Sequence, residues 1–130
     1  MTKEIINTKD APAAIGAYSQ AVKVSNNGST VYVSGQIPLD PKSMQIVSED
    51  FEAQTRQVFV NLFAVIRASG ATVENIVKLN VYLTDLSKFS ILNDVMQECF
   101  NKPYPARAAI EASALPKQVQ IEIDAVLHID

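Results

Sequence analysis

The chain has 130 residues, of which 48% are hydrophobic, and a formal net charge of −3. This length and composition predict one globular domain spanning residues 1–130, with enough apolar side chains for a real core. The weak acidic charge and the lack of a basic block argue against the concentrated positive surface that nucleic-acid binding needs, so no nucleic-acid partner is expected.

The first third of the chain has the pattern of strands joined by turns and loops. The expected elements are a short strand from residue 5, a polar loop through residues 12–14, strands at 22–24 and 30–37, and a loop at 38–49. Alternation and β-branched residues mark the strands. Asn26, Asn27 and Gly28 indicate a turn between the second and third, because Asn and Gly tolerate positive φ.

Two helices and three strands are expected in the rest of the chain. They are a helix that Asp50 caps and Gly70 ends, a strand at 76–83, a helix that Asp85 or Ser87 caps and Pro103 stops, a strand at 106–112, a turn at 115–117 and a strand at 119–129. Both helices have apolar residues at helical spacing, whereas the last strand has the clearest alternation of the whole sequence.

This order of elements predicts an α+β domain in which one sheet carries both helices on one face. The other face is then uncovered, and Glu122 and Asp124 of the last strand lie on it. A regular strand at 106–112 would add Arg107 and Ala109 to the same face. An uncovered sheet face of mixed polarity is solvated or lies in a subunit interface.

Arg107 is the strongest candidate for chemistry. It follows Pro105 and is surrounded by alanines and Ile110, so little in the local sequence satisfies a guanidinium. The planar fork of this side chain fits a carboxylate with two parallel hydrogen bonds. The alternative is a structural salt bridge at the surface or in an interface.

Glu122 occupies the middle of a strand, where glutamate is disfavoured. If an oligomer covers its face, burial would raise its pKa and make it a usable proton acceptor. The alternative is an exposed acid on the wet side of an amphipathic strand. Asp124 has the same two interpretations, and pairing with Lys78 or Lys117 is a further one.

Four other positions combine a polar or small side chain with an apolar setting. Asn93 lies near the apolar stripe of the second helix and needs a partner, which is either a nearby loop or a ligand. Tyr18 is either a core or interface aromatic or a ligand wall. Ser34 and Gly35 indicate either a bulge or a close approach of a ligand to the backbone.

Several sites and settings are not expected. The polar start, residues 1–14, is unlike a signal peptide, and no apolar run is long enough for a membrane span. A single cysteine, Cys99, forms no internal disulfide, which favours the cytoplasm, and its helical spacing suits a core thiol. With His128 as the only histidine, neither a zinc site nor a serine or cysteine triad is expected.

Five blocks of the sequence together resemble the signature of the Rid family, the reactive intermediate deaminases of the YjgF/UK114 type. The blocks are Gly16–Ala21, Val33–Pro38, residues 76–86, Pro103–Arg107 and Ile121–Ala125, in this order and across nearly the whole chain. The arginine in the Pro-Ala-Arg block resembles the RidA subgroup, which hydrolyses imines and enamines.

The resemblance implies a chorismate-mutase-like fold, with a mixed sheet of about six strands backed by two helices. It also implies a homotrimer with ligand clefts between subunits, which would account for the uncovered face. Arg107 matches the carboxylate-binding arginine and Glu122 the acid that holds the attacking water. The positions matching the wall of the cleft are Tyr18, Ser34, Gly35, Asn93 and Ala109.

The resemblance implies hydrolysis of 2-iminobutanoate and 2-iminopropanoate, a reaction for which no metal or cofactor is expected. These imines are released by enzymes that dehydrate serine and threonine. Alternatives from other classes are a regulatory or chaperone-like trimer that binds small carboxylates without turnover, and a ribonuclease or translation inhibitor. This chain departs from the family pattern in having Ala109 where many members have cysteine, so an essential thiol is not expected there. Asp124 and Ala17 also replace the frequent glutamate and proline.

Overall fold

The computed structural model describes residues 3–10, 13–25 and 27–130, so the parts of the expected loop and turn at residues 12 and 26 lie outside the described residues. The helices and strands are β1 (Lys3–Ile6), β2 (Ala21–Val24), β3 (Ser29–Gln36), α1 (Phe51–Ala68), β4 (Ile76–Leu83), α2 (Phe89–Cys99), β5 (Ala106–Glu111) and β6 (Ile121–Ile129). They confirm the predicted order of strands and helices. No helix in the described ranges is long and apolar enough to cross a membrane.

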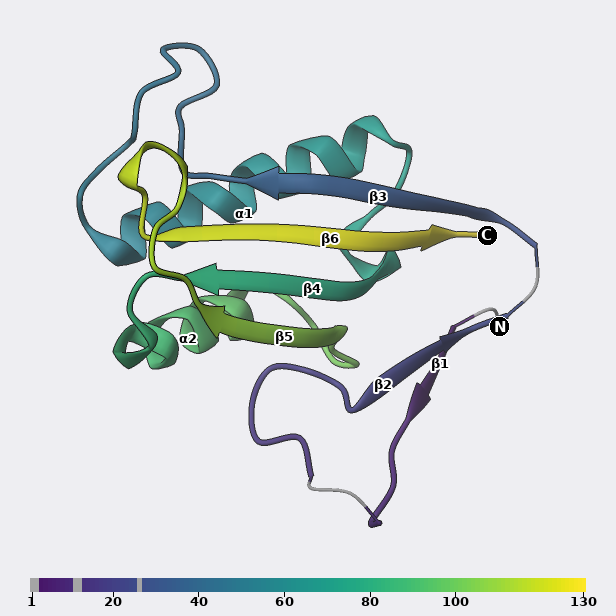
Figure 1. Ribbon diagram of the computed structural model, residues 1–130. Helices are drawn as coiled ribbons and strands as arrows, with labels where there is room; N and C mark the ends of the chain where they lie inside the picture. Colours follow the sequence, from purple (N-terminus) through teal and green to yellow (C-terminus); the bar gives the residue numbers. More distant parts are fainter. Residues whose placement is uncertain (1–2, 11–12, 26) are drawn as a thin grey trace.

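The main sheet is mixed and has the order β3-β6-β4-β5, with both helices on one face (Figure 1). β4 pairs with β5 in parallel, whereas β6 is antiparallel to both β3 and β4. Apolar side chains of the central strands pack against the helices, and the most deeply buried of them include Leu79, Leu83, Ile121, Ile123 and Leu127. The predicted α+β class is therefore confirmed.

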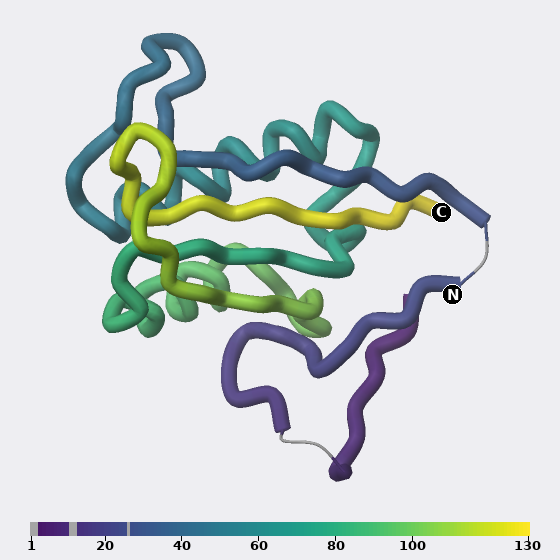
Figure 2. Tube along the Cα trace, viewed as in Figure 1, coloured from purple at the N-terminus to yellow at the C-terminus, as the bar shows by residue number. Residues whose placement is uncertain are grey.

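The expectation of one sheet with about six strands is wrong. β1 and β2 form a separate antiparallel hairpin, which lies apart from the main sheet (Figure 2). The reason is the anchor just before β2: the Ser19 amide donates to the Pro105 carbonyl at 2.9 Å, and Ser19 bridges Ala106 at the start of β5. Since β5 and β3 are opposite edges of the main sheet, β2 starts beside β5 and does not pair with β3.

The ends of α1 follow the predicted signals. The Asp50 carboxylate accepts a hydrogen bond from the Ala53 amide at 2.9 Å. Gly70 has φ 85° and its amide donates to the Arg67 carbonyl, while the Ala71 amide donates to the Ile66 carbonyl. These two bonds make the Schellman closure that a glycine at this position permits.

A short 3₁₀ turn, Leu86–Lys88, precedes α2, and the Asp85 carboxylate caps this turn by accepting a hydrogen bond from the Ser87 amide. The expectation that Asp85 or Ser87 caps α2 itself is wrong, because the turn displaces the start of α2 to Phe89 and its N-cap, Lys88, makes no side-chain capping bond.

The register of β5 decides which way its arginine faces. Arg107 pairs with Leu79 and Ala109 with Val81, and both of these β4 residues are buried under the helices. Side chains of paired residues lie on the same face of a sheet. Arg107 and Ala109 therefore lie on the helix-covered face, and the expectation that they share the uncovered face with Glu122 is wrong.

Candidate active site

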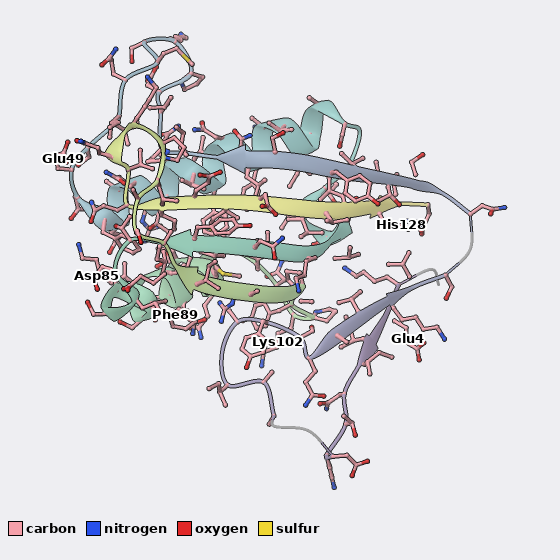
Figure 3. All side chains as sticks on the ribbon, in the orientation of Figure 1. Glu4, Glu49, Asp85, Phe89, Lys102 and His128 are labelled. Carbon is pink, nitrogen blue, oxygen red and sulfur yellow. The ribbon has the colours of Figure 1, made fainter. Side chains whose placement is uncertain are left out.

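The Arg107 guanidinium is in contact with two aromatic rings at the edge of the helix-covered face. Its Cζ is 5.0 Å from the centre of the Tyr18 ring and 4.9 Å from that of the Phe89 ring. Phe89 is the first residue of α2, beside β5 (Figure 3). Nη1 donates to Asn93 Oδ1 at 3.0 Å and to Met96 Sδ at 3.3 Å.

All of these partners are uncharged. Among the described residues, no carboxylate forms an ion pair with Arg107. Burial lowers the pKa of Arg107, and the nearby Tyr18 partly opposes that shift. Arginine remains protonated even so, because its ordinary pKa is so high. The half-buried side chain thus holds a positive charge that no anion of the described residues neutralises, which is the chemistry of a carboxylate site.

Asn93 joins the segment that carries Tyr18 to α2. Its Oδ1 accepts hydrogen bonds from the Ala17 amide, at 3.0 Å, and from Arg107. The hydroxyl of Ser19 donates to the Tyr104 carbonyl, and Ala17 is fully buried. The predicted partner of Asn93 is therefore a loop, and the same contact orients the arginine.

Glu122 lies on the uncovered face, above an irregularity in β3. The register between β3 and β6 runs from Val33 opposite Ala125 to Gln36 opposite Ile123, so two residues of β3 face one residue of β6. These two residues are Ser34 and Gly35, and the bulge expected there is confirmed. A Cβ on Gly35 would overlap Glu122 Oε2 and lie 2.8 Å from Cδ, so only glycine admits the carboxylate in this place.

Asp124, two residues further along β6, belongs to a polar cluster on the same face. Asn80 Nδ2 donates to Asp124 Oδ1 at 2.8 Å, and the Tyr82 hydroxyl donates to Oδ2 at 3.2 Å. Neither Lys78 nor Lys117 pairs with Asp124, so that interpretation is wrong. Burial, followed by the charges of Asp124 and Glu122, raises the pKa of Tyr82.

The candidate residues thus form two half-sites. Tyr18, Asn93, Arg107 and Ala109 lie at the helix-covered face, and Ser34, Gly35 and Glu122 lie at the uncovered face. β4 separates β5 from β6, which puts the two strands roughly 10 Å apart. Because the sheet lies between them, Arg107 and Glu122 of one chain cannot hold the same small ligand.

The described cavities agree with this separation. Two cavities, of ≈610 and ≈590 Å³, adjoin the β1–β2 hairpin, and neither is lined by Arg107 or Glu122. The second is lined by Gly16 and Tyr18, and it therefore adjoins the Arg107 half-site.

Phe89 and Met96 were not among the predicted site residues. Both belong to the apolar stripe of α2, Phe89 four residues before Asn93 and Met96 three residues after it. That spacing puts all three on one helix face. The pattern could therefore have associated them with Asn93, but it did not indicate that this face meets Arg107.

Comparison with known proteins defines the class. The family model described as endoribonuclease L-PSP matches residues 8–129. The chain therefore belongs to this family, the YjgF/UK114/Rid family.

Similar proteins include a RutC family protein of Pyrococcus abyssi, 45% identical over 98% of each chain, and a 2-iminobutanoate/2-iminopropanoate deaminase of Dermatophagoides farinae, 41% identical over 98% of each. Among solved structures, RidA from the Antarctic bacterium Psychrobacter sp. PAMC 21119 is 50% identical, with a TM-score of 0.75 over 97% of this chain and 99% of that one.

Proposed function

We propose that this protein is a 2-iminobutanoate/2-iminopropanoate deaminase, which hydrolyses reactive enamines and imines to 2-oxo acids and ammonia. The observation that carries the proposal is the Arg107 guanidinium, half-buried against two rings and without an ionic partner among the described residues. Relatives named as this deaminase, such as the 41% identical one of Dermatophagoides farinae, support the substrate class. The lone cysteine favours a cytoplasmic setting.

The active assembly would be a homotrimer in which the Arg107 half-site of one copy meets the Glu122 half-site of the next. The opposite orientation of these two residues in one chain supports this arrangement. The uncovered face also exposes large apolar groups, since Tyr32 is 78% and Ile110 is 52% accessible. Exposed apolar groups on a sheet face are typical of an interaction surface.

In the proposed reaction, Arg107 binds the substrate carboxylate with two parallel hydrogen bonds. Glu122 of a neighbouring copy orients one water and takes its proton as the water oxygen bonds to the carbon of the protonated imine. Glu122 then returns the proton to the nitrogen of the resulting amino alcohol, and the C–N bond breaks as ammonia leaves. The hydroxyl proton passes to the released ammonia, so the products are the 2-oxo acid and ammonium, and Glu122 is again a carboxylate. A positioned base of this kind typically contributes about 10²–10⁴-fold.

The reaction needs no metal or cofactor, because a protonated imine is already electrophilic. Tyr18 and Asn93 would contribute orientation only. Ser34, Gly35 and Ala109 would line the cleft. Because position 109 is alanine and not cysteine, it would contribute no reactive thiol.

A coupled assay tests the proposal. Threonine dehydratase would supply 2-iminobutanoate, and the rate of 2-oxobutanoate formation would be followed with and without this protein. The parent is expected to accelerate the appearance of the 2-oxo acid, whereas Arg107→Ala and Glu122→Gln would not. An Arg107→Ala variant as fast as the parent would refute the proposed carboxylate anchor. Mass measurement in solution would test the trimer.

The same assay separates the alternatives. A parent protein that binds 2-oxobutanoate but leaves the imine lifetime unchanged would be a carboxylate-binding or regulatory trimer. Salt-sensitive binding of RNA would instead support the ribonuclease or translation-inhibitor class. The net charge of −3 does not favour that class.

A further inference from the structure

The Arg107 guanidinium is in contact with several groups of the chain. Its Cζ lies over the Tyr18 and Phe89 rings, at 5.0 and 4.9 Å from their centres. Nη1 is engaged by Asn93 Oδ1 and Met96 Sδ. The edge that carries Nη2 makes no hydrogen bond to the described residues.

Gly16 lies against this remaining edge. A Cβ on Gly16 would come within 3.2 Å of Arg107 Nη2 and within 3.0 Å of Asn93 Oδ1. Such distances are tighter than ordinary van der Waals contact. The backbone of Gly16 does not need a glycine, because its φ lies outside the left-handed region. Glycine at this position therefore provides room beside Arg107 and Asn93 and is not required by the backbone conformation.

Phe89 contributes in a different way from a charged partner. An aromatic face attracts a guanidinium through its quadrupole, so it holds the cation without neutralising it. A carboxylate in place of Phe89 would compete with any carboxylate ligand. Because Phe89 begins α2 and Asn93 lies one turn later, the same end of α2 gives Arg107 both a ring contact and a hydrogen-bond acceptor.

We propose that Phe89 is a positioning residue for Arg107, and that Gly16 leaves the space beside Nη2 free for a carboxylate ligand. This inference rests on the proposed function for the identity of the ligand. It adds two residues, one whose ring packs on the cation and one that leaves space beside Nη2. Neither residue takes part in bond making or breaking.

The test measures binding of 2-oxobutanoate, the proposed product, by titration calorimetry on the assembled full-length protein. Phe89→Leu removes the ring and is expected to weaken binding about 3- to 30-fold, the range of a partly desolvated cation–π contact. Phe89→Tyr keeps the ring and is expected to bind within about twofold of the parent. Gly16→Ala is expected to weaken binding roughly 10-fold or more, because one charge-assisted hydrogen bond is obstructed.

Phe63→Leu is the matched control. Phe63 is partly buried among Phe59 and Phe100, at 5.8 Å from each ring, and is not one of the rings stacked on Arg107. This variant is expected to lose thermal stability but to keep the affinity for 2-oxobutanoate. A second readout is the ¹⁵N signal of the Arg107 Nε–H group. The ring currents of Tyr18 and Phe89 should displace it, and Phe89→Leu should move it toward the shift of exposed arginines.

The outcomes separate this inference from the proposed function. Suppose that the parent binds 2-oxobutanoate but does not hydrolyse the imine, and that Phe89→Leu and Gly16→Ala bind more weakly than the parent. This outcome supports the inference and overturns the deaminase. Parent-like binding and Nε–H signal in a folded Phe89→Leu overturn the inference and leave the deaminase intact. A parent that binds no 2-oxobutanoate also overturns the inference.

Discussion

The carboxylate of Glu122 occupies the space that a side chain on Gly35 would fill. An added Cβ at this position would overlap Oε2 and come within 3.1 Å of Cγ. The bulge in β3 and the rotamer of the proposed base are thus coupled. The position of the acid depends on a glycine of the neighbouring strand as much as on its own strand.

Gly35→Ala is therefore expected to displace Glu122 without touching Arg107. The rate of imine hydrolysis should fall about 10²-fold or more, toward that of Glu122→Gln, because the base loses its position. The affinity for 2-oxobutanoate should stay near that of the parent. Steady-state kinetics measures the rate of imine hydrolysis, and calorimetry measures the affinity for 2-oxobutanoate. Unchanged turnover in Gly35→Ala would show that the glycine does not set the position of the acid.

Asn93→Ala should affect both binding and stability, since one amide oxygen serves the Ala17 amide and Arg107. Loss of two partly buried hydrogen bonds is expected to lower the free energy of unfolding by about 1–3 kcal/mol and to weaken 2-oxobutanoate binding. Asn61→Ala is the matched control. Asn61 Nδ2 donates to the Ile37 and Leu39 carbonyls, remote from Arg107, so this variant should lose stability alone.

The thiol of Cys99 gives a pH dependence with a definite sign. Burial raises its pKa above the ordinary value of 9.0, with Arg56 opposing and Glu98 adding to the shift. A raised pKa in the folded state means stability that is present below pH 9 and is lost as the pH rises through the folded value.

The difference in unfolding free energy between the parent and Cys99→Ala should therefore decrease from pH 7.5 to pH 10.5 in urea titrations. A difference that grows with pH would contradict the assignment. Iodoacetamide should also react more slowly with the folded chain than with the urea-unfolded chain at pH 8.

Asp50→Ala tests the start of α1. The carboxylate satisfies the Ala53 amide, and its removal should lower the free energy of unfolding by about 1 kcal/mol. Asp94→Ala is a suitable control, because Asp94 is an exposed residue inside α2. Thermal unfolding of the two variants should differ by several degrees, and equal midpoints would argue against the cap.

Local signals in the sequence were sufficient for the elements. The alternation of β6 and the capping residues Asp50 and Gly70 depend on neighbours in the chain, and they predicted the strands and α1 within a few residues. The bulge at Ser34 and Gly35 was one of two interpretations of a glycine in a strand. Polar residues on apolar strands likewise indicated Arg107 and Glu122.

Relations between distant segments could not be predicted in this way. The face of Arg107 follows from the parallel register of β5 on β4, which no local pattern encodes. The separate hairpin follows from the contact of Ser19 with Pro105, 86 residues further along the chain. The role of Phe89 depends on both, because these relations bring Arg107 of β5 and the Tyr18 segment together at the start of α2.

The back-to-back placement of Arg107 and Glu122 has a genetic consequence. If sites form between copies, two inactive variants can complement each other in hybrid oligomers. Mixing unfolded Arg107→Ala and Glu122→Gln chains in equal amounts and refolding them together should rebuild about a quarter of the sites, since each rebuilt site takes its arginine from one variant and its acid from the other. Separate refolding followed by mixing, without subunit exchange, should restore none.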